Sequence, residues 1–127
     1  MKFYYNDKLV RTSKTHEYHY GVWNPMTEKM ESCHGTLDGA KKELRRRISE
    51  HETSIADEKA AIKALENGKT YILVKCCRTW TKISLRGKDL YGDDRSKIST
   101  WETYIKENEE IIKALEKRQI VELEARA

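Results

Sequence analysis

Apolar residues recur at every seventh position in two long segments, about 37–66 and 94–118, and neither segment contains proline. Isoleucine occupies the first repeating position and a second position follows three residues later, which is the a and d spacing of a heptad seam. The a positions are Ile48, Ile55 and Ile62, and then Ile98, Ile105 and Ile112. The d positions are His51, Glu58 and Leu65, and then Trp101, Asn108 and Leu115. The pattern predicts two long amphipathic helices that pack through these seams.

The two seams share one register, because the second repeats the first at an offset of fifty residues. Either an internal repeat or convergence of two amphipathic helices explains the match. The middle layer is polar, with Glu58 and Asn108 at equivalent d positions. A buried polar d residue fixes register or oligomeric state, and the alternative is a seam that splays there and admits water. Pairing within one chain and pairing across a dimer both remain open. The predicted interface comprises Ile48, Ile55, Glu58, Ile62, Trp101, Ile105, Asn108 and Ile112.

The N-terminal region has the composition and alternation of β-structure. Asn6-Asp7 separates two short strand candidates, 2–5 and 8–12, and both residues tolerate the positive φ of a tight hairpin turn. A further strand is expected from His16 to Trp23, with His16, Tyr18, Tyr20 and Val22 on one face, ended by Asn24-Pro25. Residues 29–34 are expected to return antiparallel. The result is a meander of three or four strands.

The remaining segments complete an α+β fold. Residues 70–78 are expected to form a strand that joins the small antiparallel sheet, and residues 80–85 are a weaker candidate. Ile120, Val121 and Leu123 indicate either a short strand or a fraying helix. We expect one domain over 1–127. Its parts are a meander (1–35), a first helix (36–68), a basic strand and loop segment (69–92), a second helix (93–118) and a tail (119–127).

The composition is typical of a protein from a reducing, aqueous compartment. Of the 127 residues 38% are hydrophobic and 36% charged, and no apolar run is long enough to span a bilayer, so no membrane association is expected. Three cysteines, two of them adjacent at Cys76 and Cys77, do not make a disulfide framework. We expect buried thiols and a cytoplasmic protein. The role of Cys33 and the adjacent pair beyond packing stays open.

The sequence lacks the motifs of catalysis and of metal or cofactor binding. There is no C-x-x-C or H-x-x-x-H spacing, no G-x-S-x-G or S-x-x-K, and no glycine-rich phosphate loop. Cys33 and His34 are neighbours in an expected strand, so their side chains point to opposite faces. We therefore expect no enzyme, no cofactor and no metal site.

A basic and aromatic segment between the helices is the strongest candidate for binding. Cations and aromatic rings alternate there with no acidic residue from Lys69 to Lys88, which is typical of surfaces that stack bases and hold phosphates. A solvated loop whose tryptophan packs in the core is the alternative. A second basic cluster, residues 41–47, opens the first helix. The candidate ligand-binding residues are Tyr71, Arg78, Trp80, Lys82, Arg86, Lys88 and Tyr91, with Arg45 from the second cluster.

Two stretches resemble small proteins of bacteriophages and prophages. They are Tyr5-Asn6-Asp7-Lys8-Leu9-Val10-Arg11-Thr12-Ser13-Lys14 and Cys33-His34-Gly35-Thr36. The order of short strands, long helix, strand and long helix is similar to type I Thoeris anti-defence proteins. The resemblance implies a dimer or larger assembly in the host bacterial cytoplasm that sequesters a cyclic ADP-ribose isomer without hydrolysing it. It also implies that Trp80 stacks on adenine and that Arg78, Arg86 and Arg45 hold phosphates.

The leading functional hypothesis is therefore a phage-type anti-defence protein that acts by stoichiometric binding of a cyclic nucleotide signal. An anti-CRISPR-type inhibitor that binds an effector nuclease is the alternative from a different class, and it would use the helices and the acidic second helix. A nucleic-acid-binding accessory protein that uses the basic segment is a further alternative.

Overall fold

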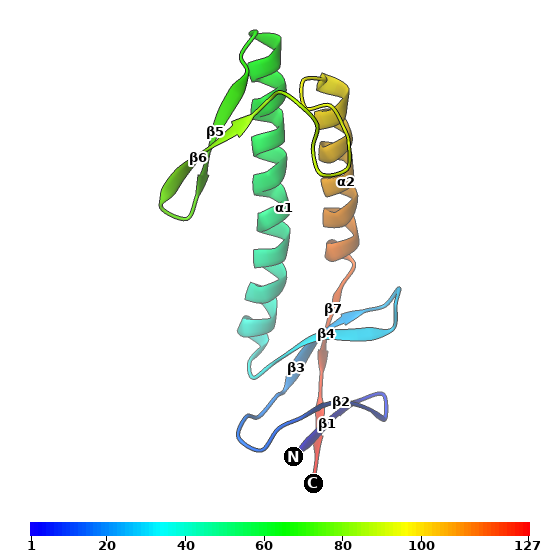
Figure 1. The fold of residues 1–127 in the computed structure, drawn as a ribbon. Helices are drawn as coiled ribbons and strands as arrows, with labels where there is room; N and C mark the ends of the chain where they lie inside the picture. Colours follow the sequence, from blue (N-terminus) through cyan, green and yellow to red (C-terminus); the bar gives the residue numbers. More distant parts are fainter. The chain divides into compact units, whose positions relative to one another are not determined.

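The computed structural model describes residues 1–127 and contains two helices and eight strands in small antiparallel sheets (Figure 1). The predicted α+β class is confirmed. The residues gather into two compact units, of which unit 1 comprises residues 1–49 and 113–127 and unit 2 comprises residues 50–112. Neither helix combines the length and the apolar character needed to cross a membrane.

Unit 1 contains two three-stranded sheets, and each joins an N-terminal hairpin to a strand from the C-terminal end of the chain. The first sheet has the order β2-β1-β8, where β1 is Lys2–Tyr5, β2 is Lys8–Thr12 and β8 is Glu124–Arg126. The second has the order β4-β3-β7, where β3 is Tyr20–Asn24, β4 is Lys29–His34 and β7 is Gln119–Glu122. Pairing of β1 with β8 brings the two chain termini to the same sheet (Figure 1).

The first predicted hairpin is confirmed, because Asn6 and Asp7 form its turn with φ angles of 49° and 61°. The next strand begins at Tyr20 and not at His16, so that prediction was wrong at its start. The hydroxyl of Ser13 accepts a hydrogen bond from the amide of His16 at 3.0 Å. This local side-chain contact competes with strand pairing and holds the backbone in a turn.

The expected single meander is corrected to two hairpins in two different sheets. The C-terminal tail forms strands and not a fraying helix, since Ile120 lies opposite Val22 in the register of β7 with β3. Val22 is fully buried, so an apolar residue is favoured opposite it, which explains why the tail pairs with β3.

An ion-pair cluster ties three segments of unit 1 together. The Glu31 carboxylate on β4 accepts hydrogen bonds from the guanidinium groups of Arg118 at 2.8 Å and Arg47 at 3.0 Å. The side chain of Arg118 is only 13% exposed. Although burial raises the pKa of Glu31, these two guanidinium groups outweigh burial and hold that pKa below its usual range.

The two helices are α1, Leu37–Glu66, and α2, Ile98–Glu116. The predicted bounds of α1 are confirmed, since the Thr36 hydroxyl accepts a hydrogen bond from the Gly39 amide as an N-cap and Gly68 follows the helix with a φ of 70°. α2 begins four residues later than predicted, at Ile98 in place of 94. The carboxylate of Asp94 accepts hydrogen bonds from both the amide and the hydroxyl of Ser96, which holds this stretch in a turn before the helix.

The core of unit 2 lies where a two-stranded hairpin packs with the two helices. Its strands are β5, Tyr71–Cys76, and β6, Thr79–Ser84, and they form a sheet of their own in place of the predicted extension of the N-terminal sheet. Every residue of β5 pairs with β6, from Tyr71 opposite Ser84 to Cys76 opposite Thr79. The buried core residues are Ala61, Ala64, Ile72, Leu85 and Trp101.

The residues buried along the two helices are not simply those of the predicted heptad seam. Trp101, one of the predicted interface residues, is buried at 9% exposure, whereas the predicted interface isoleucines are only partly buried. Those isoleucines are Ile48, Ile55, Ile62, Ile105 and Ile112. Ala61 and Ala64, which the heptad pattern did not single out, are the most buried residues of this part of α1 because the hairpin covers that face.

The polar layer is closed within one chain. The Asn108 amide donates to both carboxylate oxygens of Glu58, at 2.9 and 3.0 Å, and also to the Tyr104 carbonyl. His51 Nδ1 lies 2.8 Å from Asn108 Oδ1. Burial, which the Asn108 hydrogen bond only partly offsets, raises the pKa of Glu58. The equivalent d residues therefore meet in unit 2, a point that the sequence had left open.

Candidate functional site on the β5–β6 hairpin

The register of the hairpin sorts its side chains into an inner and an outer face. Ile72 pairs with Ile83 and packs toward the core of unit 2. Successive side chains of a strand alternate between faces, so the neighbouring pairs lie on the opposite side. This outer face is formed by Tyr71, Leu73 and Lys75 of β5 and by Trp80, Lys82 and Ser84 of β6.

Large apolar side chains remain exposed on the outer face. Trp80 is 65% exposed, Leu73 56% and Tyr71 46%. Trp80 therefore does not pack in the core, which was the alternative interpretation of the basic segment. Aromatic rings left in water on a two-stranded ribbon do not stabilise the fold, and such surfaces are typical of binding sites.

Two lysines place positive charge directly on this face. Lys82 Nζ lies 4.4 Å from the centre of the Tyr71 ring, a cation–π contact that holds the ammonium beside the aromatic face. Lys75 lies opposite Trp80 in the strand register. The outer face contains no carboxylate, so it favours an anionic ligand with a planar ring.

The hairpin turn carries two exposed thiols. Cys76 and Cys77 are both exposed, with their sulfur atoms 4.0 Å apart, which contradicts the expectation of buried thiols for this pair. Cys77 adopts a φ of 62° and forms the turn together with Arg78. The hydrogen bond to the neighbouring Cys77 sulfur and the electrostatic effect of that residue raise the pKa of the Cys76 thiol. Cys33, in β4, is partly buried, and burial raises the pKa of its thiol.

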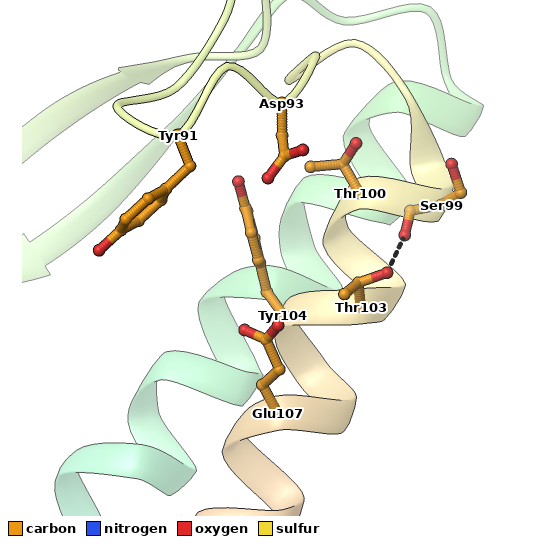
Figure 2. Close-up of a pocket in the computed structure, with 7 residues that line it drawn as sticks. All are labelled: Tyr91, Asp93, Ser99, Thr100, Thr103, Tyr104 and Glu107. Atoms are coloured by element: carbon orange, nitrogen blue, oxygen red, sulfur yellow. Dashed lines mark hydrogen bonds between the residues drawn. The ribbon is translucent and has the colours of Figure 1, made fainter.

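The other predicted binding residues occupy three further places. Arg86 follows β6, and its backbone amide donates a hydrogen bond to the Ser84 hydroxyl. Lys88 pairs with Asp94 through the backbone in an isolated antiparallel β-bridge. Tyr91 lines a separate cavity beside α2 (Figure 2). Arg45 belongs to the part of α1 in unit 1. The structure therefore groups Tyr71, Trp80 and Lys82 on one face, with Arg78 at its turn.

A hollow of about 590 Å³ opens at the base of the hairpin, between the end of α1 and β5. Ala60, Ala64 and Ile72 contribute apolar surface to the lining of this basal hollow, and its volume is within the usual range of small-molecule sites. Its remaining lining residues are Lys63, Asn67, Gly68, Lys69, Thr70, Tyr71 and Leu73. The predicted binding residues include neither Lys63 nor Lys69, although Lys69 begins the predicted basic segment.

The candidate site combines positive charge, hydrogen-bonding groups and aromatic rings. The outer face and the basal hollow contain lysine, amide, hydroxyl and aromatic groups, and neither is lined by a carboxylate or a histidine. No group of three or more metal-ligating side chains occurs in residues 1–127. Comparison of the chain with protein-family models, with curated proteins and with solved structures finds no match.

Proposed function

We propose that this chain is a non-enzymatic binding protein that holds a nucleotide at the base of the β5–β6 hairpin. The observation that carries the proposal is the Tyr71 ring, which lies at the junction of the outer face and the basal hollow with Lys82 against it. The ring offers a surface for base stacking. Lys63 and Lys69, which line the same hollow, supply charge for phosphates.

The resemblance to type I Thoeris anti-defence proteins directs the choice of nucleotide. We propose a cyclic ADP-ribose isomer that is sequestered and not hydrolysed, so that a phage product of this kind would withdraw an immune signal in the host cytoplasm. The proposed stacking residue moves from Trp80 to Tyr71. Trp80 lies opposite Lys75, four residues along the strand from Tyr71, which is roughly 13 Å away at the usual rise per residue.

Calorimetry and thermal shift with cyclic ADP-ribose isomers, ADP-ribose and AMP test this proposal. We expect one ligand per site. Tyr71→Ala should weaken binding about ten-fold or more, because a stacked base contributes about 1–3 kcal/mol. Lys69→Ala should also weaken binding, whereas Lys41→Ala, an exposed lysine on the unit 1 part of α1, is the matched control and should not. Ligand recovered intact after heating supports sequestration. No binding of any of these nucleotides would refute the proposal.

A single-stranded nucleic acid is a second candidate, favoured by the open, elongated shape of the outer face. Tyr71 and Trp80 lie at opposite ends of this face with Lys75 and Lys82 beside them, an arrangement that suits successive stacked bases. In that case Trp80→Ala and Tyr71→Ala weaken binding of an oligonucleotide equally. Affinity must also fall steeply with salt, because phosphate contacts release counterions. Native mass spectrometry of protein from cells with an active defence system separates a small ligand, an oligonucleotide and an effector nuclease, and it reports the oligomeric state.

A further inference from the structure

The turn that joins β5 to β6, at the tip of the hairpin, carries two adjacent thiols (Figure 1). Cys76 is the last residue of β5 and Cys77 is the first residue of the turn. Both side chains are exposed, and their sulfur atoms lie 4.0 Å apart in a weak hydrogen bond. Neither cysteine lines the basal hollow. Cysteine is among the residues most often buried in proteins, so packing does not account for this exposed pair.

The turn holds Cys77 in a conformation that suits glycine or asparagine better. Its φ is 62°, in the left-handed region that a residue with a β carbon rarely adopts. The turn is held on one side by the Thr79 hydroxyl, which donates a hydrogen bond to the Cys76 carbonyl at 3.1 Å. Residues in such conformations are destabilising and cluster at functional sites. The second thiol therefore occupies this position at a conformational cost.

Positive charge flanks the two thiols. Lys75 precedes them and Arg78 follows them, both exposed, and no acidic residue occurs from Lys69 to Lys88. Nearby cations favour the thiolate, which is the reactive form of cysteine, and they attract anionic reagents. Because the hydrogen bond to Cys77 and the electrostatic effect of that residue raise the pKa of Cys76, the pair releases its two protons in separate steps. One sulfur is then a thiolate while its neighbour still holds a proton.

We propose that Cys76 and Cys77 form a reversible thiol–disulfide site that is oxidised by an anionic low-molecular-weight disulfide such as glutathione disulfide. One cysteine thiolate attacks a sulfur of the reagent, the S–S bond of the reagent breaks, and one glutathione thiolate leaves and takes up a proton. The neighbouring cysteine loses its proton to water and attacks the protein sulfur of this mixed disulfide, which releases the second glutathione. The two cysteines are oxidised to one disulfide, and the reagent is reduced to two thiols.

A disulfide between adjacent cysteines is easily reduced again. The Cα atoms of adjacent residues are about 3.8 Å apart, which is below the roughly 4.4 Å at which ordinary disulfides begin. The bond is therefore strained, and strained disulfides are the labile and regulatory ones. The two sulfur atoms must also approach from 4.0 Å to about 2.0 Å, so oxidation has to move the turn. A bond of this kind is transient in a reducing compartment.

Reaction of the reduced full-length protein with excess glutathione disulfide tests the proposal, with acid quenching, alkylation of free thiols and intact mass spectrometry. We expect the wild type to lose two hydrogen atoms and to keep no glutathione, because the adjacent thiol resolves the mixed disulfide within the molecule. Cys76→Ser and Cys77→Ser should each keep one glutathione. Cys33→Ser is the matched control and should react as the wild type does, since Cys33 is partly buried in another sheet. Reduced glutathione should restore both thiols.

Four results would count against the site. A stable glutathione adduct on the wild type, disulfide-linked dimers, or no reaction at all would each overturn the proposal. Cystamine, a cationic disulfide, should react several-fold more slowly than glutathione disulfide at low salt, and equal rates would overturn the preference for an anionic reagent. Arg78→Gln should slow the reaction with glutathione disulfide several-fold, with a smaller difference at high salt, whereas Lys41→Gln should react at the wild-type rate.

Discussion

Replacing Asn108 by alanine tests the polar layer between the helices of unit 2. Its amide nitrogen donates to Glu58, whose residue exposure is 9%, and to the Tyr104 carbonyl. The amide has two hydrogens, so the contacts of 2.9 and 3.0 Å to the two Glu58 oxygens are one shared hydrogen bond and not two. Its oxygen also lies 2.8 Å from His51 Nδ1. Alanine removes all of these contacts and leaves the buried Glu58 carboxylate without this donor.

The expected loss of stability at pH 7 is about 2–3.5 kcal/mol. A hydrogen bond to a charged group contributes about 1.5–3 kcal/mol, and the His51 contact adds about 1 kcal/mol. The higher helix propensity of alanine offsets about 0.5 kcal/mol of this loss.

The loss should shrink as the pH falls, because the pKa of Glu58 is already raised by burial and removal of the Asn108 donor raises it further. A raised pKa in the folded state means that the charged carboxyl opposes folding above that pKa and that protonation removes this penalty below it. The variant therefore gains more from acid than the wild type does, and the difference between them falls to about 1 kcal/mol.

Urea unfolding followed by circular dichroism at pH 7 and pH 4 measures this difference. The control is the same substitution in a Glu58→Gln background, where the expected loss is small and independent of pH. Glu58→Gln alone should be as stable as the wild type or more stable at pH 7, since it removes a buried charge and keeps an acceptor for Asn108. An Asn108→Ala loss of the same size at both pH values, or of the same size in the wild-type and Glu58→Gln backgrounds, would refute the account of a buried charged acceptor.

Three further outcomes follow from the described contacts. Glu31→Gln should destabilise unit 1 by about 1–3 kcal/mol at pH 7 in thermal unfolding, and because the folded pKa is lowered, the loss should disappear as the pH falls through that pKa. Cys76 and Cys77 should react with a disulfide reagent in seconds to minutes, whereas the partly buried Cys33 should react more slowly, as mass spectrometry of the labelled protein would show. Gly68→Ala should cost about 1 kcal/mol in urea unfolding because its φ is 70°, and equal stability would contradict this reasoning.

Local pattern was sufficient for the bounds of α1 and for the first hairpin. Heptad spacing depends on neighbours in sequence, and the segment 37–66 that it predicts agrees with the bounds of α1. The start of α2 was predicted four residues too early because Asp94 is equally suited to cap a helix and to hold a turn with Ser96. Trp101, whose indole donates a hydrogen bond to the Arg95 carbonyl, distinguishes the turn at Asp94 from a helix cap, and this contact is not visible in the local pattern.

Sheet partners were beyond the reach of one sequence. Strands β7 and β8 pair with strands about a hundred residues away, and short apolar stretches such as 120–123 fit a frayed helix equally well. The alternation in β5 correctly separates Tyr71 from Ile72, but it does not reveal which face is covered. That choice depends on the long-range packing of Ile72 with Ala61 and Leu85. The predicted binding residues Tyr71, Trp80 and Lys82 share the outer face, and Lys63 and Lys69 of the basal hollow were not among the predicted residues.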